Sequence, residues 1–290
     1  MRHAAAVLAM GAALWVAGCT SPAPVELQQE AATVEATQIE NVGGDLDLAS
    51  VDSSGVTPAE QLRVSGRMQV TEVRMDNGQG VRRFVVGSAL FQDLRLPVVI
   101  GGRTFGYYGL PVRSLALDGV PMVRVPHTVH VRGFVRDTVH AGVEYLQDLT
   151  ATYTPGRLYV WGVRATASSD SVTIPVTAPG PLTVLAPAGG TSVPRGSDLR
   201  LRWSAAGRVH VIVSAVDPLT GRTKPRVQLT VPGGTTEAVV PARLLSGFPA
   251  GPYAFTFVQA NRFELPTLTD PQGKVLVQAA TLYTVFVALR

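Results

Sequence analysis

The chain has 290 residues, of which 46% are hydrophobic and 16% charged, with 29 glycines, 21 prolines and one cysteine. Its length suffices for two ordinary domains, and the many turn-forming residues favour short strands over helices. A single cysteine excludes a disulfide within the chain, so stability in an oxidising compartment would depend on core burial alone.

The first nineteen residues, MRHAAAVLAMGAALWVAGC, have the composition of a secretory signal. A basic start is followed by an apolar stretch that is too short to span a bilayer, then by small residues. The segment VAGC, ending at Cys19, resembles the lipobox of bacterial lipoprotein precursors. This resemblance implies cleavage between Gly18 and Cys19, a diacylglyceryl thioether on the Cys19 sulfur and a further acyl chain on the new amino terminus.

The alternative is an ordinary signal peptide, residues 1–18, followed by a chance cysteine. More than one acyl chain is generally needed for stable anchoring, and a triacylated cysteine meets that condition. In the family, Asp directly after the cysteine tends to retain the protein at the inner membrane. Thr20 occupies that position here, so the resemblance implies an outer-membrane anchor, facing either the periplasm or the cell surface.

Residues 19–58 are predicted to be a flexible tether between the lipid and the folded body. Between Cys19 and Leu62 there are eight acidic residues and no Lys, Arg or aromatic residue. Such a segment buries too little apolar surface to offset ordering, and its charges repel one another. We expect it to act as a spacer; a recognition tail for a partner is the alternative.

The folded body is basic, because residues 63–290 contain 24 basic and 13 acidic residues, a net charge of about +11. A basic body could contact anionic lipid, lipopolysaccharide or nucleic acid. The arginines are scattered and do not cluster with aromatic residues, which argues against a nucleic-acid groove.

Residues 59–178 are predicted to form a first β-sandwich or barrel-like domain, since short strands recur every ten or so residues. The dipeptides Asn77-Gly78 and Asp118-Gly119 are hairpin signals. We expect strands at residues 63–75, 81–91, 94–100, 103–110, 113–117, 128–136, 143–154, 157–165 and 171–177.

Two groups of side chains in this unit are candidates for binding. His127, His130 and His140 could suggest a metal, but period-two alternation places the first two on opposite strand faces and no carboxylates complete a ligand set. We therefore expect half-buried or surface histidines and no metal. The segment DNGQG, residues 76–80, lacks the later acids of a calcium loop, so a hairpin turn is expected.

Strand aromatics are the second group. Tyr107, Tyr159 and Trp161, with Tyr108 beside the first, could line a glycan-binding face. Packing in the core or on a sheet surface is the alternative.

Residues 179–290 are predicted to form a second β-sandwich, which begins after the strand-breaking sequence APGP at residues 178–181. Trp203 in an early strand and the run from Leu245 to Tyr253 resemble the immunoglobulin-like and fibronectin type III-like sandwiches of bacterial surface proteins. The resemblance implies a corner contact made by Tyr253, and a role in adhesion, spacing or partner binding. Strands are expected at residues 182–186, 198–204, 208–215, 226–231, 237–240, 254–260 and 274–289.

Catalytic signatures are absent from the sequence: it has no Gly-x-Ser-x-Gly, Ser-x-x-Lys or His-Glu-x-x-His motif. Glu144 and Asp148 could be paired acids on one strand face, but scattered solvent-facing acids are the default. We therefore expect an all-β protein without enzymatic activity or cofactor. Its expected role is a structural or protein-binding lipoprotein of the cell envelope; the alternative is a lipoprotein that binds peptidoglycan or surface polysaccharide.

Overall fold

A computed structural model describes most of the folded body and two short segments before it. The described residues are 25–27, 35–38, 64–100, 102–130, 138–205, 207–219, 221, 223–231, 234–266 and 274–290. The predicted lipidation and cleavage positions, Cys19 and Gly18, lie outside them. None of the described helices is long and apolar enough to cross a membrane.

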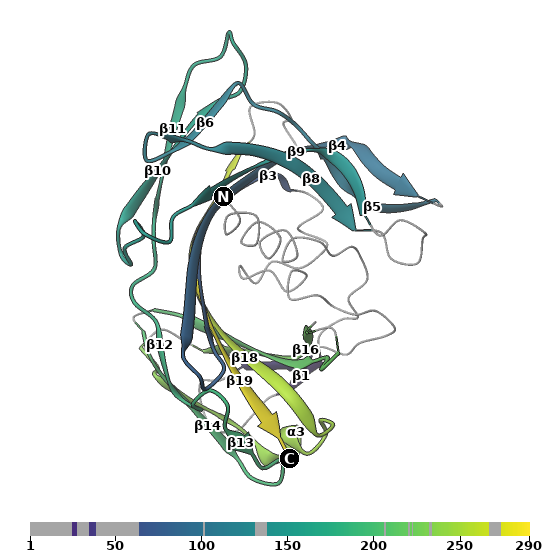
Figure 1. Ribbon diagram of the computed structural model, residues 1–290, viewed down its shortest axis with the longest axis vertical. Helices are drawn as coiled ribbons and strands as arrows, with labels where there is room; N and C mark the ends of the chain where they lie inside the picture. The colour runs from purple at the N-terminus through teal and green to yellow at the C-terminus, as the bar shows by residue number, and fades with distance from the viewer. Residues whose placement is uncertain are drawn as a thin grey trace.

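As predicted, the described chain is almost entirely β-structure. Its described elements also include a four-residue helix, α3 (Ala242–Leu245). A curved twelve-stranded sheet runs through the molecule (Figure 1). Its strands, in spatial order, are β1 (Val25–Leu27), β2 (Glu35–Gln38), β16 (Thr223–Val231), β15 (Val209–Val216), β18 (Gly251–Pro266), β19 (Lys274–Leu289), β3 (Val64–Asp76), β4 (Val81–Ile100), β5 (Arg103–Gly109), β9 (Thr138–Asp148) and β8 (Val123–His130), with β13 (Ser192–Val193) paired to β19.

Two small sheets pack on one face of this large sheet. The first contains β11 (Val172–Thr177), β10 (Leu158–Arg164), β6 (Ser114–Leu117) and β7 (Val120–Pro121). The second contains β12 (Thr183–Ala186), β14 (Leu199–Ser204) and β17 (Glu237–Val240). Each encloses a separate hydrophobic core against the large sheet, so the molecule consists of two β-sandwiches that share a sheet.

A buried tryptophan anchors each core. Trp161 of β10 lies in the core of the first small sheet, and Trp203 of β14 lies in the core of the second. The prediction that Trp203 occupies a core strand is therefore confirmed. Truncating a buried aromatic of this size to alanine typically costs about 3–5 kcal/mol.

Strand β19 joins the two sandwiches. Its alternate side chains face the cores: Val277 and Ala279 belong to the first, whereas Tyr283 and Val285 belong to the second. Along most of its length β19 pairs in parallel with β3, from which it is separated by about two hundred residues. The first strand of one predicted unit and the last strand of the other are thus neighbours, an arrangement that the predicted division at residues 178/179 did not anticipate.

The structure differs from the predicted tether at two short segments. Strands β1 and β2 form an antiparallel pair, and β2 adds to the edge of β16 through residues 35–38. This pairing could not be predicted, because strands of three and four residues are too short to show a reliable alternation. Residues 25–27 and 35–38 therefore belong to the large sheet.

Both predicted hairpin signals are confirmed. Strands β3 and β4 are joined across Asn77-Gly78, with Gly78 at a φ of 84°. Asp118 and Gly119 both have positive φ, 51° and 76°, and connect Leu117 to its partner Val120. Two positive φ values are the requirement of a type I′ turn, which explains the Asp-Gly pair at this position.

Candidate interaction surface

The aromatic side chains predicted to bind glycan do not form one face. Tyr159 and Trp161 are only 1% and 0% exposed and lie in the first core. The Tyr159 ring stacks on Tyr153, with centroids 5.6 Å apart, and its hydroxyl accepts a hydrogen bond from the Thr154 amide at 2.8 Å. Tyr107 lies in β5, in the large sheet. Because two of the three rings are inaccessible to a ligand, this arrangement argues against the predicted glycan face.

The predicted histidines and acids are arranged differently from a metal site. His127 Nδ1 lies 3.3 Å from Glu144 Oε2, and both side chains are buried. A register shift between Pro126 and Thr128 turns His127 toward β9. Within the described residues, no group of three or more His, Cys, Asp or Glu side chains could hold a metal ion.

The remaining candidates of this group have local roles. His140 is exposed on β9, and the side chain of His130 lies outside the described part of the chain. Asp148 accepts a hydrogen bond from the Thr150 amide at 2.8 Å and so caps the turn after β9. Glu144 and Asp148 therefore have separate partners and do not act as a pair.

The segment predicted to be a hairpin turn rather than a calcium loop uses its oxygens internally. Asp76 Oδ1 accepts a hydrogen bond from the Gly78 amide at 2.9 Å, and Asn77 Oδ1 accepts one from Gln79 at 3.0 Å. The second Asp76 oxygen accepts a bond from the Gly189 amide at 3.3 Å. The turn thus also contacts the second sandwich.

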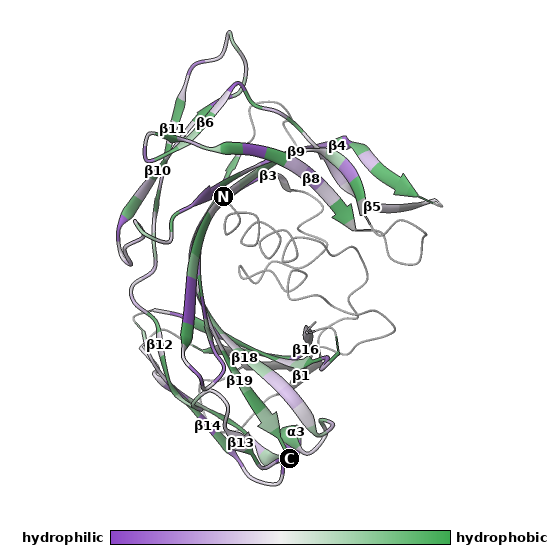
Figure 2. Cartoon of the chain, in the orientation of Figure 1, coloured by the Kyte–Doolittle hydropathy of each residue, from purple (hydrophilic) through white to green (hydrophobic). Residues whose placement is uncertain are grey.

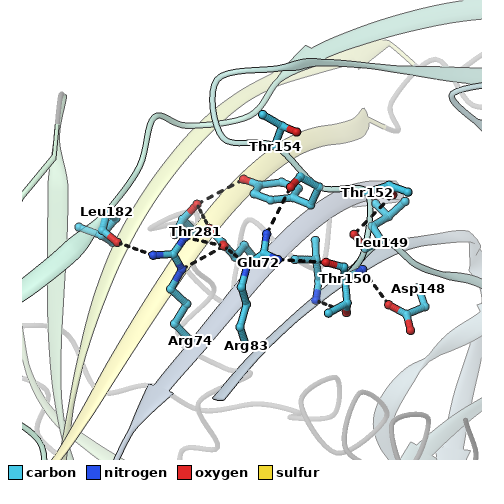
Figure 3. Close-up of polar contacts among 12 residues, drawn as sticks. Glu72, Arg74, Arg83, Asp148, Leu149, Thr150, Thr152, Thr154, Leu182 and Thr281 are labelled. Carbon is cyan, nitrogen blue, oxygen red and sulfur yellow. Dashed lines mark hydrogen bonds and ion pairs between the residues drawn. The ribbon is translucent and has the colours of Figure 1, made fainter. Parts of the chain in front are cut away.

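A buried carboxylate lies between the two cores, and sequence reasoning missed it. Glu72 of β3 is 0% exposed. Its Oε1 accepts hydrogen bonds from Arg74 Nε and Nη2 at 3.0 and 2.9 Å and from Arg83 Nε at 2.7 Å (Figure 3). Its Oε2 accepts a bond from the Thr281 hydroxyl at 3.4 Å. Thr281 lies in β19 between the residues that face one core and those that face the other.

The two arginines extend this cluster to both sandwiches. Arg74 Nη1 donates to the Leu182 carbonyl at 3.4 Å, at the start of the second unit. Arg83 donates to the carbonyls of Thr150 and Tyr153 in the first unit, at 3.0 and 3.3 Å. Burial, with the nearby Glu72 charge, raises the pKa of Tyr153 to about 12 although its bond to Thr281 opposes the shift, so the phenol stays neutral.

This cluster, which we call the Glu72 junction, has the properties of a structural cross-link. Both oxygens of the carboxylate accept bonds from protein donors, and two guanidinium groups balance one negative charge. A catalytic acid or base needs reach to a substrate proton, and Glu72 is enclosed by its partners. The one sequence signal was periodicity: Met68 and Val70 precede Glu72 at period two on the buried face.

The β4–β5 hairpin has several exposed apolar side chains. It carries Leu96, Val99 and Tyr108, which are 48%, 53% and 42% exposed. The hairpin extends away from the two small sheets (Figure 1), and the arrowhead of β4 is coloured hydrophobic in Figure 2. Because Pro97 pairs with Tyr107, Leu96 and Tyr108 lie side by side on one face of the hairpin, and Val99 lies on the other face. We call Leu96 and Tyr108 the hairpin patch.

A small satellite core supports this hairpin. Val98 of β4 packs with Val129 of β8 and Ala141 of β9, all three buried. Val99, one position further along the strand, therefore points to the opposite face. Arg95 and Asp93 form an ion pair with two hydrogen bonds of 2.8 Å. Both residues lie where the pairing of β4 with β5 shifts register, between Gln92 and Pro97. The hairpin patch is thus held on a packed element rather than on a loop.

Comparison with known proteins adds little. No protein-family model matches the chain, and no curated protein matches it. Among solved structures, the fibronectin(III)-like modules of Clostridium thermocellum CbhA align with a TM-score of 0.19 and 10% identity, covering 76% of this chain and 93% of that one. The mu-homology domain of yeast delta-COP-I, complexed with a Dsl1 peptide, aligns with a TM-score of 0.23 and 9% identity. This alignment covers 78% of this chain and 98% of that one. At such scores neither likeness carries an argument.

The corner contact expected for Tyr253 is not formed within the described residues. The Tyr253 hydroxyl is buried and has no hydrogen-bond partner there. Its ring instead stacks on Phe248, with centroids 5.7 Å apart and planes at 14°. The sandwich description therefore rests on the packing of the sheets and not on this motif.

Proposed function

We propose that the chain is a lipoprotein of the bacterial cell envelope whose folded part is a non-catalytic structural or protein-binding module. A lipid on Cys19 anchors it to the outer membrane, and the sandwiches present a surface to an envelope protein. The VAGC segment and the single cysteine support the anchor. Thr20 in place of Asp supports the outer membrane as its destination.

The hairpin patch is the observation that carries the binding role. Soluble proteins expose single apolar side chains commonly, but apolar groups gathered on one projecting element mark interaction sites. Here two large, exposed apolar side chains, Leu96 and Tyr108, lie side by side on one face of a hairpin that its own satellite core supports. The basic charge of the body, about +11 over residues 63–290, favours a partner whose surface around the contact is acidic.

The polar clusters support a non-catalytic role. Glu72 is saturated by arginine and threonine donors, and Glu144 faces His127 within the sheet. Neither arrangement adds a nucleophile positioned by a base, which covalent catalysis requires. The buried positions of Tyr159 and Trp161 give no support to the glycan-binding alternative.

Fractionation of the native envelope tests the anchor. We expect the wild-type protein in the outer-membrane fraction and a Cys19→Ala variant released into the soluble fraction. A Thr20→Asp variant, which keeps the lipid, should move to the inner-membrane fraction. Identical distributions of the wild-type and Cys19→Ala proteins would sink the proposal.

A further inference from the structure

Two arginines lie near a buried tyrosine of the second sandwich. Arg226 occupies the register shift between β15 and β16. Tyr253 of β18 pairs with Ala215 of β15. Ala215 pairs on its other side with Lys224 of β16, two residues before Arg226. Arg195 follows β13; its amide donates to the Arg290 carbonyl at 2.9 Å, and its Nη1 donates to the Phe248 carbonyl at 2.7 Å. Phe248 stacks on Tyr253.

Each of these three side chains has a buried polar atom without a partner among the described residues. They are the Tyr253 hydroxyl, Arg195 Nε and Arg226 Nε. Tyr253 is only 2% exposed. A buried donor or acceptor left unpaired costs about 1–3 kcal/mol. The charges of both arginines act on the Tyr253 phenol, and a bound ligand is one accepted explanation for unpaired buried atoms.

We propose that Arg195, Arg226 and Tyr253 form a binding site for an oxyanion, that is, for a phosphate or carboxylate group of a ligand. The proposal does not depend on the lipid anchor or on the hairpin patch. Guanidinium groups bind such oxygens with strong, charge-assisted hydrogen bonds. The phenol supplies a neutral donor, and the stack on Phe248 fixes its ring.

The local electrostatics fit an anion better than a cation or a neutral ligand. Burial raises the pKa of the Tyr253 phenol, and the positive charges of Arg226 and Arg195 only partly oppose the shift. The phenol therefore remains protonated at neutral pH and can donate. Other arginines of the same sandwich do pair with an acid: Arg200 and Arg202 lie 3.5 and 3.9 Å from Glu237. By contrast, Arg195 and Arg226 form no ion pair with an acid of the described part of the chain.

Arginine Nε–H signals in a ¹H–¹⁵N spectrum of the detergent-solubilised full chain test the proposal. Inorganic phosphate and acetate are titrated separately against chloride at equal ionic strength. We expect saturable shifts of the Arg195 and Arg226 signals, and the anion that saturates at lower concentration identifies the preferred chemistry. Arg226→Gln should weaken binding about tenfold or more. Tyr253→Phe keeps the ring, removes only the hydroxyl and should also weaken binding.

Arg200→Gln is the control, because it removes one exposed guanidinium of the same sandwich. It should leave the affinity unchanged. The proposal is overturned by shifts that do not saturate with either anion, by unchanged binding in the Arg226→Gln and Tyr253→Phe variants, or by an equal loss in the control. Neither site variant removes a hydrogen bond present within the described residues, so a folded protein is expected in each case.

Discussion

Replacing Glu72 by glutamine tests the Glu72 junction with almost no change of shape. The substitution keeps an acceptor oxygen but removes the charge that balances Arg74 and Arg83. Breaking a fully buried ion pair typically costs about 3–5 kcal/mol. The side chains of Arg74 and Arg83 are 21% and 33% exposed, so water compensates part of the loss, and we expect a destabilisation of about 2–3 kcal/mol.

Urea unfolding followed by far-ultraviolet circular dichroism measures this change. A loss of 2–3 kcal/mol should lower the midpoint by roughly 1 M urea, given slopes of about 1–3 kcal/mol per molar for proteins. Glu237→Gln is the matched control: its arginine contacts are long and exposed, and it should cost no more than about 0.5 kcal/mol. Equal midpoints for the wild-type and Glu72→Gln proteins would refute the assignment of the junction as a stabilising cross-link.

Three further predictions concern the shared sheet, a crowded glycine and an exposed ion pair. With 5-fluorotryptophan incorporated, the ¹⁹F signals of Trp161 and Trp203 should lose their native positions at the same urea concentration, because β19 contributes to both cores; separate midpoints would contradict this. Gly142→Ala should destabilise the protein by about 1–3 kcal/mol in thermal unfolding, since Gly142 has a φ of 90° and a Cβ there would strike the backbone of β5. The pKa of Asp93, measured by NMR titration, should be about 2 because Arg95 binds the carboxylate. Since the pKa is lowered in the folded state, any stabilisation is present above about pH 4 and is lost as the pH falls toward 2. Arg95→Ala should return the pKa of Asp93 toward 3.8.

The turns and most strands could be predicted from sequence because their signals are local. Asn77-Gly78 and Asp118-Gly119 specify tight turns by the φ values that they permit, and the alternation at residues 198–204 marks β14. The pairing of β3 with β19 could not be predicted, since strand alternation does not say which distant strand lies alongside. The strands β1 and β2, of three and four residues, are too short for alternation to identify them.

In the candidate site, too, local sequence patterns predict some features, while others depend on strands that are distant in sequence. Alternation indicates that Tyr159 and Trp161 belong to a strand, but not which face of that strand a second sheet covers. Whether the two rings are buried or free to bind a ligand therefore could not be predicted. Glu72 lay on an apolar face by period two, yet its partners Arg83 and Thr281 come from other strands. Exposure of Val99 likewise depends on the satellite core formed by strands distant in sequence.

Photo-crosslinking in the intact envelope tests the proposed function most directly. A photoreactive amino acid at Leu96 should give a discrete adduct with one envelope protein, and the Tyr108→Asp substitution in the same chain should abolish it. The same amino acid at Leu219, which is 95% exposed in the β15–β16 connection, is the control and should give no such adduct. Absence of an adduct from Leu96, or the same adducts from both positions, would contradict the account of this chain as an envelope lipoprotein that binds a protein partner through the hairpin patch.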